Sequence, residues 1–414
     1  MILKLKNPVR PYPWGSRSYL QGLLGLPNEL GKPLAELWIG AHPLAPSRIE
    51  SSGESLEEYI SKNPHPALGA AREINRDKLP YLFKVLAVAE PLSIQIHPNK
   101  AQAEAGFIRE NQAGIPLDDP KRNYKDDNHK PELIMALTPF RALCGLREYE
   151  QIISFGESLS WAKFFPLWKS FAASASEQSF QAWFLSLMDS EARLLADLIS
   201  QTDSLLDKAK LIPEDVKSLF RTLRQRYPLD LGLFFPFLLN LVNLAPGQAL
   251  FLEAGILHAY LEGSGLELMA SSDNVIRAGL TPKHIDLEEF KRVCRFQPYK
   301  PELLEASSPS ELNSLRLKAF NTPIRDFRLQ ILELDDREGI VLDPQGLPSL
   351  LFCLEGKLCF GRTESPAPGI HGRAESFFIT ANQKPFELMG PCRLALVDIP
   401  SSGTLSGDLN ETKA

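Results

Sequence analysis

The sequence predicts a mostly β fold, of the jelly-roll or barrel kind, interrupted by a block of helices. Short runs of alternating apolar and polar residues, separated by Pro and Gly, fill residues 1–147 and return after Pro246 and Gly247. Such runs are typical of strands joined by turns. Between residues 148 and 243, Pro and Gly become fewer and apolar residues recur every three or four positions, the period of a helix.

This pattern divides the 414 residues, too many for one ordinary core, into several units. Residues 1–147 and 244–306 form a first β domain, 148–243 a helical domain, and 307–400 a second β domain that starts at a polar break near Ser307. The tail 401–414 is small and polar, and we expect it to be loose. We predict strands at Phe327–Leu334, Ser349–Leu354 and Arg393–Asp398, and a buried helix over Leu231–Leu244.

Composition and charge exclude several classes of function. The formal net charge is -6 and no run of Lys and Arg could form a basic face, so we expect no nucleic-acid partner. A phosphorylated metabolite stays possible, because one local cluster of Lys and Arg is enough to bind a single phosphate. The first residues contain no apolar signal core, so we expect no secretory signal, and the most apolar stretch is too short to span a membrane. The five scattered cysteines contain no C-x-x-C pair, which favours a reducing cytosol.

The segment from Leu92 to Pro98 carries the first candidate site residues. In a strand, side chains alternate between the two faces, so Ile94 and Ile96 point into a core while Gln95 and His97 share the other face. Pro98 ends the strand because it cannot donate to the ladder. The sequence therefore predicts that Gln95 and His97 face one cavity.

Three further segments offer polar groups. If Asn128–Ala136 is extended, Lys130 and Glu132 share a face, either as an ion pair or as a metal ligand beside an acid–base group. His258 lies in an otherwise apolar stretch. In a strand over 272–279, Asp273 would lie on the same side as Arg277. Two His, one Glu and one Gln make a plausible zinc shell with a net positive charge, which suits a developing oxyanion.

Simpler interpretations remain open on pattern alone. A lone histidine such as His258 is more often a hydrogen-bonded core residue than a ligand. Glu132 beside Lys130 is usually a surface ion pair, and Arg277 a solvated strand residue. The spacing by itself indicates a mostly β protein with a candidate metal site.

Longer motifs support the candidate site because they occur together and in a fixed order. The chain resembles the type I (cupin-like, zinc-dependent) phosphomannose isomerases in the stretches Tyr12–Ser16, Ala35–Pro43, Pro91–Lys100, Asn128–Glu132, Gly255–Ala259 and Ser272–Thr281. The resemblance covers the first 150 residues and roughly 245–290. It implies a cupin-like jelly roll and a second C-terminal β jelly roll, with an inserted α-helical domain.

The resemblance also implies the ligands and the reaction. One Zn²⁺ per chain would be held by Gln95, His97, Glu132 and His258. The reaction would interconvert mannose 6-phosphate and fructose 6-phosphate through a cis-enediol. An active-site arginine falls on Arg277. Apart from the resemblance, we expect a monomer in the cytoplasm.

Such a reaction needs a base that moves a proton between C1 and C2 and a group that stabilises the enediolate. Lys130, His129 and Asp273 are the candidates for the base, unranked. Arg277 is the first choice for contact with the phosphate or the enediolate. Three further residues are expected to bind substrate: Lys84, Ser93 and Lys100.

Two other functions are considered. A cupin-fold oxygenase would hold iron with two His and one carboxylate, but Glu132 lies 35 residues after His97 instead of a few. A non-catalytic sugar-phosphate sensor would bind without turnover and need no metal.

Overall fold

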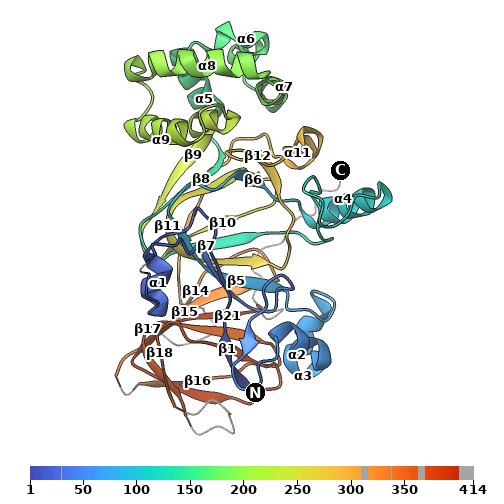
Figure 1. Ribbon diagram of the computed structural model, residues 1–414, viewed down its shortest axis with the longest axis vertical. Helices are drawn as coiled ribbons and strands as arrows, with labels where there is room; N and C mark the ends of the chain where they lie inside the picture. Colours follow the sequence, from blue (N-terminus) through green and yellow to red (C-terminus); the bar gives the residue numbers. More distant parts are fainter. Residues whose placement is uncertain (29, 309–315, 337, 362–368, 401–414) are drawn as a thin grey trace.

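The computed structural model describes residues 1–28, 30–308, 316–336, 338–361 and 369–400. In this part of the chain, strands form two large antiparallel sheets, and most of the helices lie together at one end (Figure 1). The mostly β class with a helical interruption is therefore confirmed. The predicted loose tail, 401–414, lies outside the described residues.

The first sheet carries the candidate site and has the central order β13-β10-β7-β11-β5-β3-β2. Its strands are β2 (Val9–Arg10), β3 (Glu36–Ile39), β5 (Tyr81–Val88), β6 (Ile94–Ile96), β7 (Glu132–Ala136), β8 (Phe140–Leu146), β9 (Leu239–Leu244), β10 (Gln248–Leu252), β11 (His258–Ala270), β12 (Ile276–Gly279) and β13 (Leu303–Glu305).

The second sheet has the central order β14-β15-β21-β17-β19-β1-β4. Its strands are β1 (Ile2–Lys6), β4 (Arg48–Ile49), β14 (Leu317–Ala319), β15 (Arg328–Leu334), β16 (Gly339–Leu342), β17 (Ser349–Phe360), β18 (Ile370–Gly372), β19 (Ser376–Ile379), β20 (Phe386–Met389) and β21 (Cys392–Asp398). The three C-terminal strands predicted from the sequence are β15, the start of β17, and β21. Strands β1 and β4 also belong here, although the predicted boundaries put residues 1–147 in the first domain.

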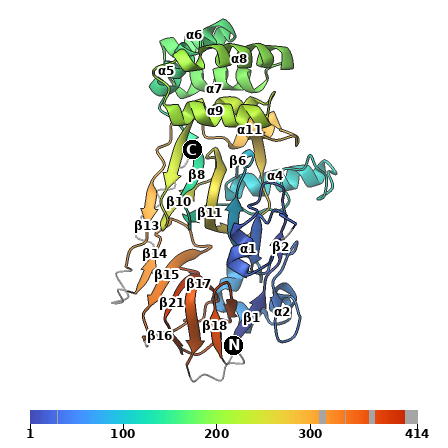
Figure 2. The same ribbon diagram turned by 60° about the vertical axis from the view of Figure 1, so that its left-hand side comes forward.

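The helical block packs at the end of the first sheet, as both ribbon views show (Figures 1 and 2). Its helices are α5 (Tyr149–Ser158), α6 (Pro166–Ala173), α7 (Glu177–Met188), α8 (Ala192–Leu205) and α9 (Glu214–Arg226), with 3-10 turns η2 (Trp161–Lys163) and η3 (Leu206–Lys208). They enclose an aromatic core in which Trp161, Trp168 and Trp183 are almost fully buried. Apolar residues at helical spacing, as the sequence predicts, form this core.

The predicted helix over Leu231–Leu244 is wrong in its second half. The chain forms the 3-10 turn η4 (Leu231–Phe234) and the short α10 (Phe235–Leu238), and then strand β9, which pairs with β8. A short apolar run fits a buried helix and a buried strand equally well, so periodicity could not separate them.

The remaining helices lie outside the helical block in the sequence, and two of them begin with a capping box. Ser55 caps one and Asn99 the other, each paired with the side chain three residues later. These helices and turns are α1 (Tyr19–Leu24), α2 (Leu56–Lys62), α3 (Pro64–Leu68), η1 (Gly69–Glu73), α4 (Lys100–Gln112) and α11 (Leu287–Val293).

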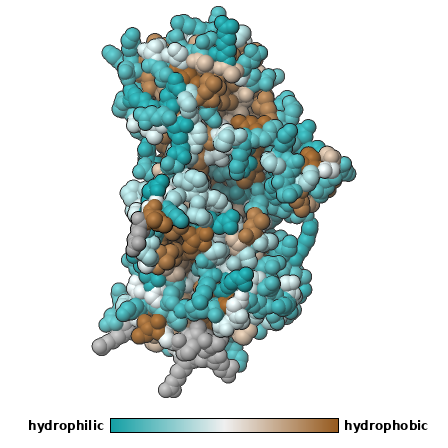
Figure 3. Space-filling view, viewed as in Figure 1, coloured by the Kyte–Doolittle hydropathy of each residue, from teal (hydrophilic) through white to brown (hydrophobic). Residues whose placement is uncertain are grey.

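A shared apolar core joins the two sheets. Phe83 of β5 packs edge to face on Phe352 of β17, with ring centroids 6.1 Å apart. The Tyr81 hydroxyl donates to the Val397 carbonyl across the same boundary, at 3.3 Å. The face drawn in Figure 3 is mostly hydrophilic, with small apolar groups between. No helix within the described residues has the length and apolar character to cross a bilayer.

Candidate metal centre

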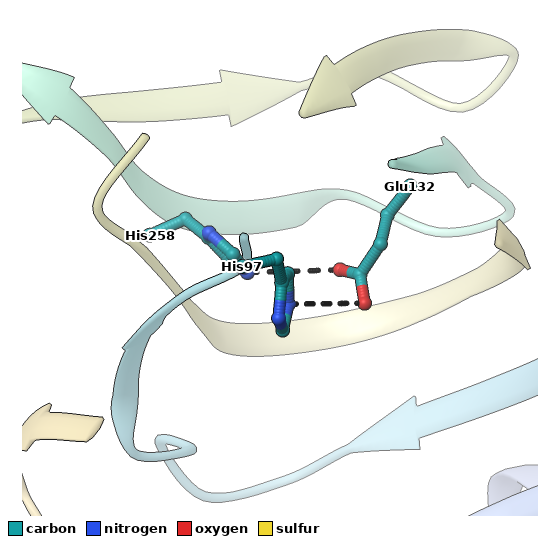
Figure 4. Close-up of side chains that lie close together, drawn as sticks. All are labelled: His97, Glu132 and His258. Carbon is teal, nitrogen blue, oxygen red and sulfur yellow. Dashed lines mark ion pairs between the residues drawn. The ribbon is translucent and has the colours of Figure 1, made fainter. Parts of the chain in front are cut away.

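Three buried side chains from distant parts of the chain meet at one point (Figure 4). His97 directly follows β6, whereas Glu132 begins β7 and His258 begins β11. Glu132 Oε1 lies 3.3 Å from His97 Nε2, and Glu132 Oε2 lies 3.6 Å from His258 Nε2. One ligand atom from each residue lies within 4.8 Å of the others. The three residues can therefore hold a single ion.

The hydrogen bonds of the two imidazoles orient them for a metal. His97 Nδ1 lies 2.8 Å from the Asn274 carbonyl, and His258 Nδ1 lies 2.9 Å from the Ile256 carbonyl. A carbonyl only accepts, so each Nδ1 carries the hydrogen and each Nε2 presents a lone pair. Both Nε2 atoms are buried without a hydrogen-bond partner in the described part of the chain. A metal ion would satisfy both.

The charges at the centre favour the ligand forms of these residues. Burial, together with the charge of Lys130, lowers the pKa of His97 to about 4, so the ring is neutral at physiological pH. Burial by itself would raise the pKa of Glu132, but Lys130 and His97 bring it well below its ordinary value. Glu132 is therefore an ionised ligand, and Lys130 Nζ lies 3.0 Å from its Oε1.

The strand register places Gln95 beside the cluster. In β6, Gln95 lies opposite His258 of β11 on one side and opposite Arg277 of β12 on the other. Residues directly opposite in antiparallel strands have their side chains on the same face of the sheet. Gln95 therefore shares a face with His258 and Arg277, and its role as a fourth ligand stays a prediction.

Gly255 connects the backbone segments that carry the two histidines. Its φ is +78°, which favours glycine, and an added Cβ would lie 2.8 Å from the Val293 carbonyl oxygen. Its N–H donates to the His97 carbonyl at 2.8 Å. The tight turn therefore brings the start of β11 close to the end of β6.

Arg277 is a half-buried cation that has no ion pair within the described ranges. Burial lowers its pKa. The charge of Arg277, followed by burial, lowers the pKa of Lys283 as well. Neither cation has an ion pair in the part of the chain that the structure describes, which suits contact with an anion.

Two predicted catalytic residues contact side chains other than the three candidate ligands. His129 Nε2 lies 3.0 Å from both carboxylate oxygens of Asp326, in the segment before β15. Asp273 Oδ2 lies 3.3 Å from His42 Nε2. The prediction of Asp273 and Arg277 in one strand is wrong, because β12 begins only at Ile276. Asp273 lies in the preceding loop, whose backbone carries the carbonyl of Asn274.

The predicted substrate-binding residues differ in their surroundings. Lys84 is buried and lies 2.9 Å from Glu267 Oε2; burial alone would lower its pKa, but Glu267 and Glu36 raise it above the ordinary value. Lys100 is exposed at the start of α4 and donates to the Asp127 carbonyl at 2.9 Å. Ser93 is half-buried just before β6.

Sequence reasoning missed two groups that support the centre. The Tyr260 hydroxyl donates to Glu132 Oε2 at 3.4 Å; strand alternation could have found it, since it lies two residues after His258. Asn274 is fully buried and takes part in hydrogen bonds with residues 125–128, among them one of 2.7 Å from the Lys125 N–H. No pattern in the sequence indicates that contact.

Known proteins match this chain over most of its length. A family model described as the type I phosphomannose isomerase catalytic domain matches residues 2–149. The mannose-6-phosphate isomerase of Escherichia coli strain K12 is 40% identical over 401 residues, which cover 95% of this chain and 98% of that protein. The human mannose-6-phosphate isomerase is 32% identical over 412 residues, with coverage of 92% and 94%.

Solved structures give the same result. A crystal structure of a mutant phosphomannose isomerase from Salmonella typhimurium matches with a TM-score of 0.88 and 39% identity, covering 96% of this chain and 99% of that one. A mannose 6-phosphate isomerase bound with zinc and yttrium matches with a TM-score of 0.86 and 38% identity, covering 97% and 100%. The chain therefore belongs to the type I phosphomannose isomerases.

Proposed function

We propose that this chain is a zinc-dependent aldose–ketose isomerase that interconverts mannose 6-phosphate and fructose 6-phosphate through a cis-enediol. The observation that carries the proposal is the pair of buried, unpartnered Nε2 atoms that converge with the carboxylate of Glu132. A mannose 6-phosphate isomerase of the same fold has been crystallised with zinc.

The residues present fit zinc. Two neutral imidazoles and one carboxylate are ordinary zinc ligands, and Gln95 would supply a carboxamide oxygen from the same face of the sheet. When bound, zinc would polarise the sugar carbonyl and stabilise negative charge on the enediolate. Glu132 offsets one of the two charges of the ion, so the site would stay net positive.

Among the three candidates for the base, the surroundings favour Asp273. The base must be unprotonated and able to reach the substrate, and His129 is engaged by Asp326 while Lys130 is paired with Glu132. Asp273 keeps a partly exposed carboxylate, and one of its oxygens has no partner in the described structure. It would accept a proton from one sugar carbon and return it to the neighbouring carbon.

Lys130 and His129 would then act on the substrate in other ways. Lys130 Nζ lies beside the metal ligand Glu132, where it could donate to a sugar oxygen. His129 precedes it, and the ring contact with Asp326 would hold this part of the loop in place.

Arg277 and Lys283 would bind the phosphate. Neither has an ion pair within the described residues, and a dianionic phosphate would compensate both charges. Contacts of Lys84, Ser93 and Lys100 with the substrate stay proposals. The cytoplasmic location, the monomeric state and the domain boundaries predicted from the sequence also stay proposals.

Conversion of mannose 6-phosphate to fructose 6-phosphate by purified, zinc-loaded protein under anaerobic conditions tests the function. Isomerisation needs no oxygen, whereas a cupin-fold oxygenase would be inactive. A sugar-phosphate sensor would bind the substrate without turnover. Absence of fructose 6-phosphate with zinc-loaded protein would reject the proposal.

A further inference from the structure

His42 lies in the motif Ala35–Pro43 and has no part in the function proposed so far. The loop after β3 carries it to Asp273, 231 positions later in the chain, where His42 Nε2 lies 3.3 Å from Asp273 Oδ2. The His42 ring is only 6% exposed. It packs edge to face on Trp38, with centroids 5.0 Å apart. The ring therefore cannot turn away without losing packing.

Backbone hydrogen bonding fixes which His42 nitrogen carries a hydrogen. The Leu44 N–H donates to His42 Nδ1 at 3.3 Å, so Nδ1 presents a lone pair. The hydrogen then lies on Nε2, the atom that faces the Asp273 carboxylate. His42 is thus arranged to hold one carboxylate oxygen, Oδ2, and leave the other available.

Asp273 is held from other sides as well. Its N–H donates to Asp126 Oδ2 at 2.8 Å, and that carboxylate also accepts from Ser272 and from the Asn128 N–H. Burial would raise the pKa of Asp273, but the contact with His42 and the charges of Lys130 and Lys84 lower it. Within the described residues, His42 is the neighbour whose side chain contacts the Asp273 carboxylate directly.

We propose that His42 is a positioning residue for the isomerase reaction: it fixes the Asp273 carboxylate so that the free oxygen faces the substrate. The inference rests on the proposed function, because it gives His42 a role through the proposed base. A purely structural His42 would fill space beside Trp38 and make no difference to proton transfer.

Three substitutions of zinc-loaded protein test the proposal by steady-state kinetics. His42→Leu removes the ring hydrogen, His42→Gln restores an N–H at similar reach, and His42→Asn places one too short to reach Asp273. His371→Leu is the matched control, because His371 is also 6% exposed and lies 3.5 Å from Glu375, but in the second sheet. Zinc content is measured for each variant.

The expected result is a kcat for His42→Leu that is lower by about 10- to 100-fold, the range in which placement of a base affects rate. KM should change less than threefold. His42→Gln should recover most of the kcat, His42→Asn should not, and His371→Leu should leave kcat unchanged.

A kcat within twofold of wild type in folded, zinc-loaded His42→Leu would overturn the inference, as would equal impairment of the Gln and Asn variants. If His42→Leu fails to fold, the kcat of His42→Gln compared with that of His42→Asn decides whether the N–H that reaches Asp273 is needed. Inactive wild-type protein would reject the proposed function instead, so the two failures are distinguishable.

Discussion

Asn274 gives the sharpest test of how the protein supports its metal centre. The buried Asn274 side chain shares five hydrogen bonds with residues 125–128, while its backbone carbonyl orients the His97 ring. Substitution of Asn274 by Ala removes all five bonds and leaves two backbone N–H groups, of Lys125 and Asp126, without that acceptor.

The size of the effect follows from this geometry. At about 1 kcal/mol for each hydrogen bond, Asn274→Ala should lower the free energy of unfolding by about 3–5 kcal/mol. A loosened carbonyl no longer fixes the His97 tautomer and ring orientation, so zinc affinity should fall by about 10- to 100-fold. Urea unfolding of metal-free protein measures the first quantity, and competition with a zinc chelator measures the second.

Asn7→Ala is the control for Asn274→Ala. The side-chain amide of Asn7 is also hydrogen-bonded at both ends, but beside the second sheet. Its oxygen accepts from Ser47, and its nitrogen donates to Ser376. Asn7→Ala should destabilise the protein without changing zinc affinity. If Asn274→Ala keeps its zinc affinity within threefold while losing stability, the orienting role of the Asn274 carbonyl is refuted.

Three further predictions concern the loop before β7 and the charge on His97. Lys130→Met should retain zinc, measured by metal analysis, and lose at least tenfold in kcat; loss of zinc would contradict a role in catalysis alone. Asp326→Asn should lower kcat about tenfold because it loosens His129, whereas Tyr81→Phe, which removes another bond between the sheets, should not. As the pH falls below 6.5, the unfolded chain protonates His97, whereas the folded protein keeps the ring neutral until about pH 4. Metal-free protein should therefore lose roughly 3 kcal/mol of its free energy of unfolding between pH 6.5 and 4. A pH-independent urea midpoint would contradict this.

The local part of the site could be predicted from the sequence. Alternation placed Ile94 and Ile96 in the core, where both are fully buried, and assigned Gln95 to the opposite face. Lys130 and Glu132 were expected to share a face, and their side chains are in contact although Lys130 precedes the strand. A period of two residues is a short-range property, so it can be recognised in a single segment.

Long-range contacts could not be predicted in this way. His42 meets Asp273, His129 meets Asp326, and Asn274 meets the loop before Glu132, with separations of about 150 to 230 residues. Loop geometry and sheet order determine these contacts, and neither produces a periodic pattern in the sequence. The choice of Gln95 as a ligand and of the sugar phosphate as substrate likewise came from resemblance to the family.

The second sheet shows the same limit for the fold. Its C-terminal strands were predicted because β15, β17 and β21 contain short runs of mostly apolar residues, with Leu the most frequent. The pairing of β1 with β19 joins the first strand of the chain to the C-terminal β region, with Ile2 opposite Ile379. A strand pattern specifies which face is apolar but not which strand is the neighbour.

The central claim is that one zinc ion at His97, Glu132 and His258 makes isomerisation possible. Metal-free protein is titrated with zinc while fructose 6-phosphate formation from mannose 6-phosphate is followed, in the wild type and in His97→Ala. Wild-type activity should be absent without metal and should rise to a plateau at one zinc per chain, whereas His97→Ala should stay inactive at that ratio. Turnover by metal-free protein, or full activity of His97→Ala at one equivalent of zinc, would contradict the account.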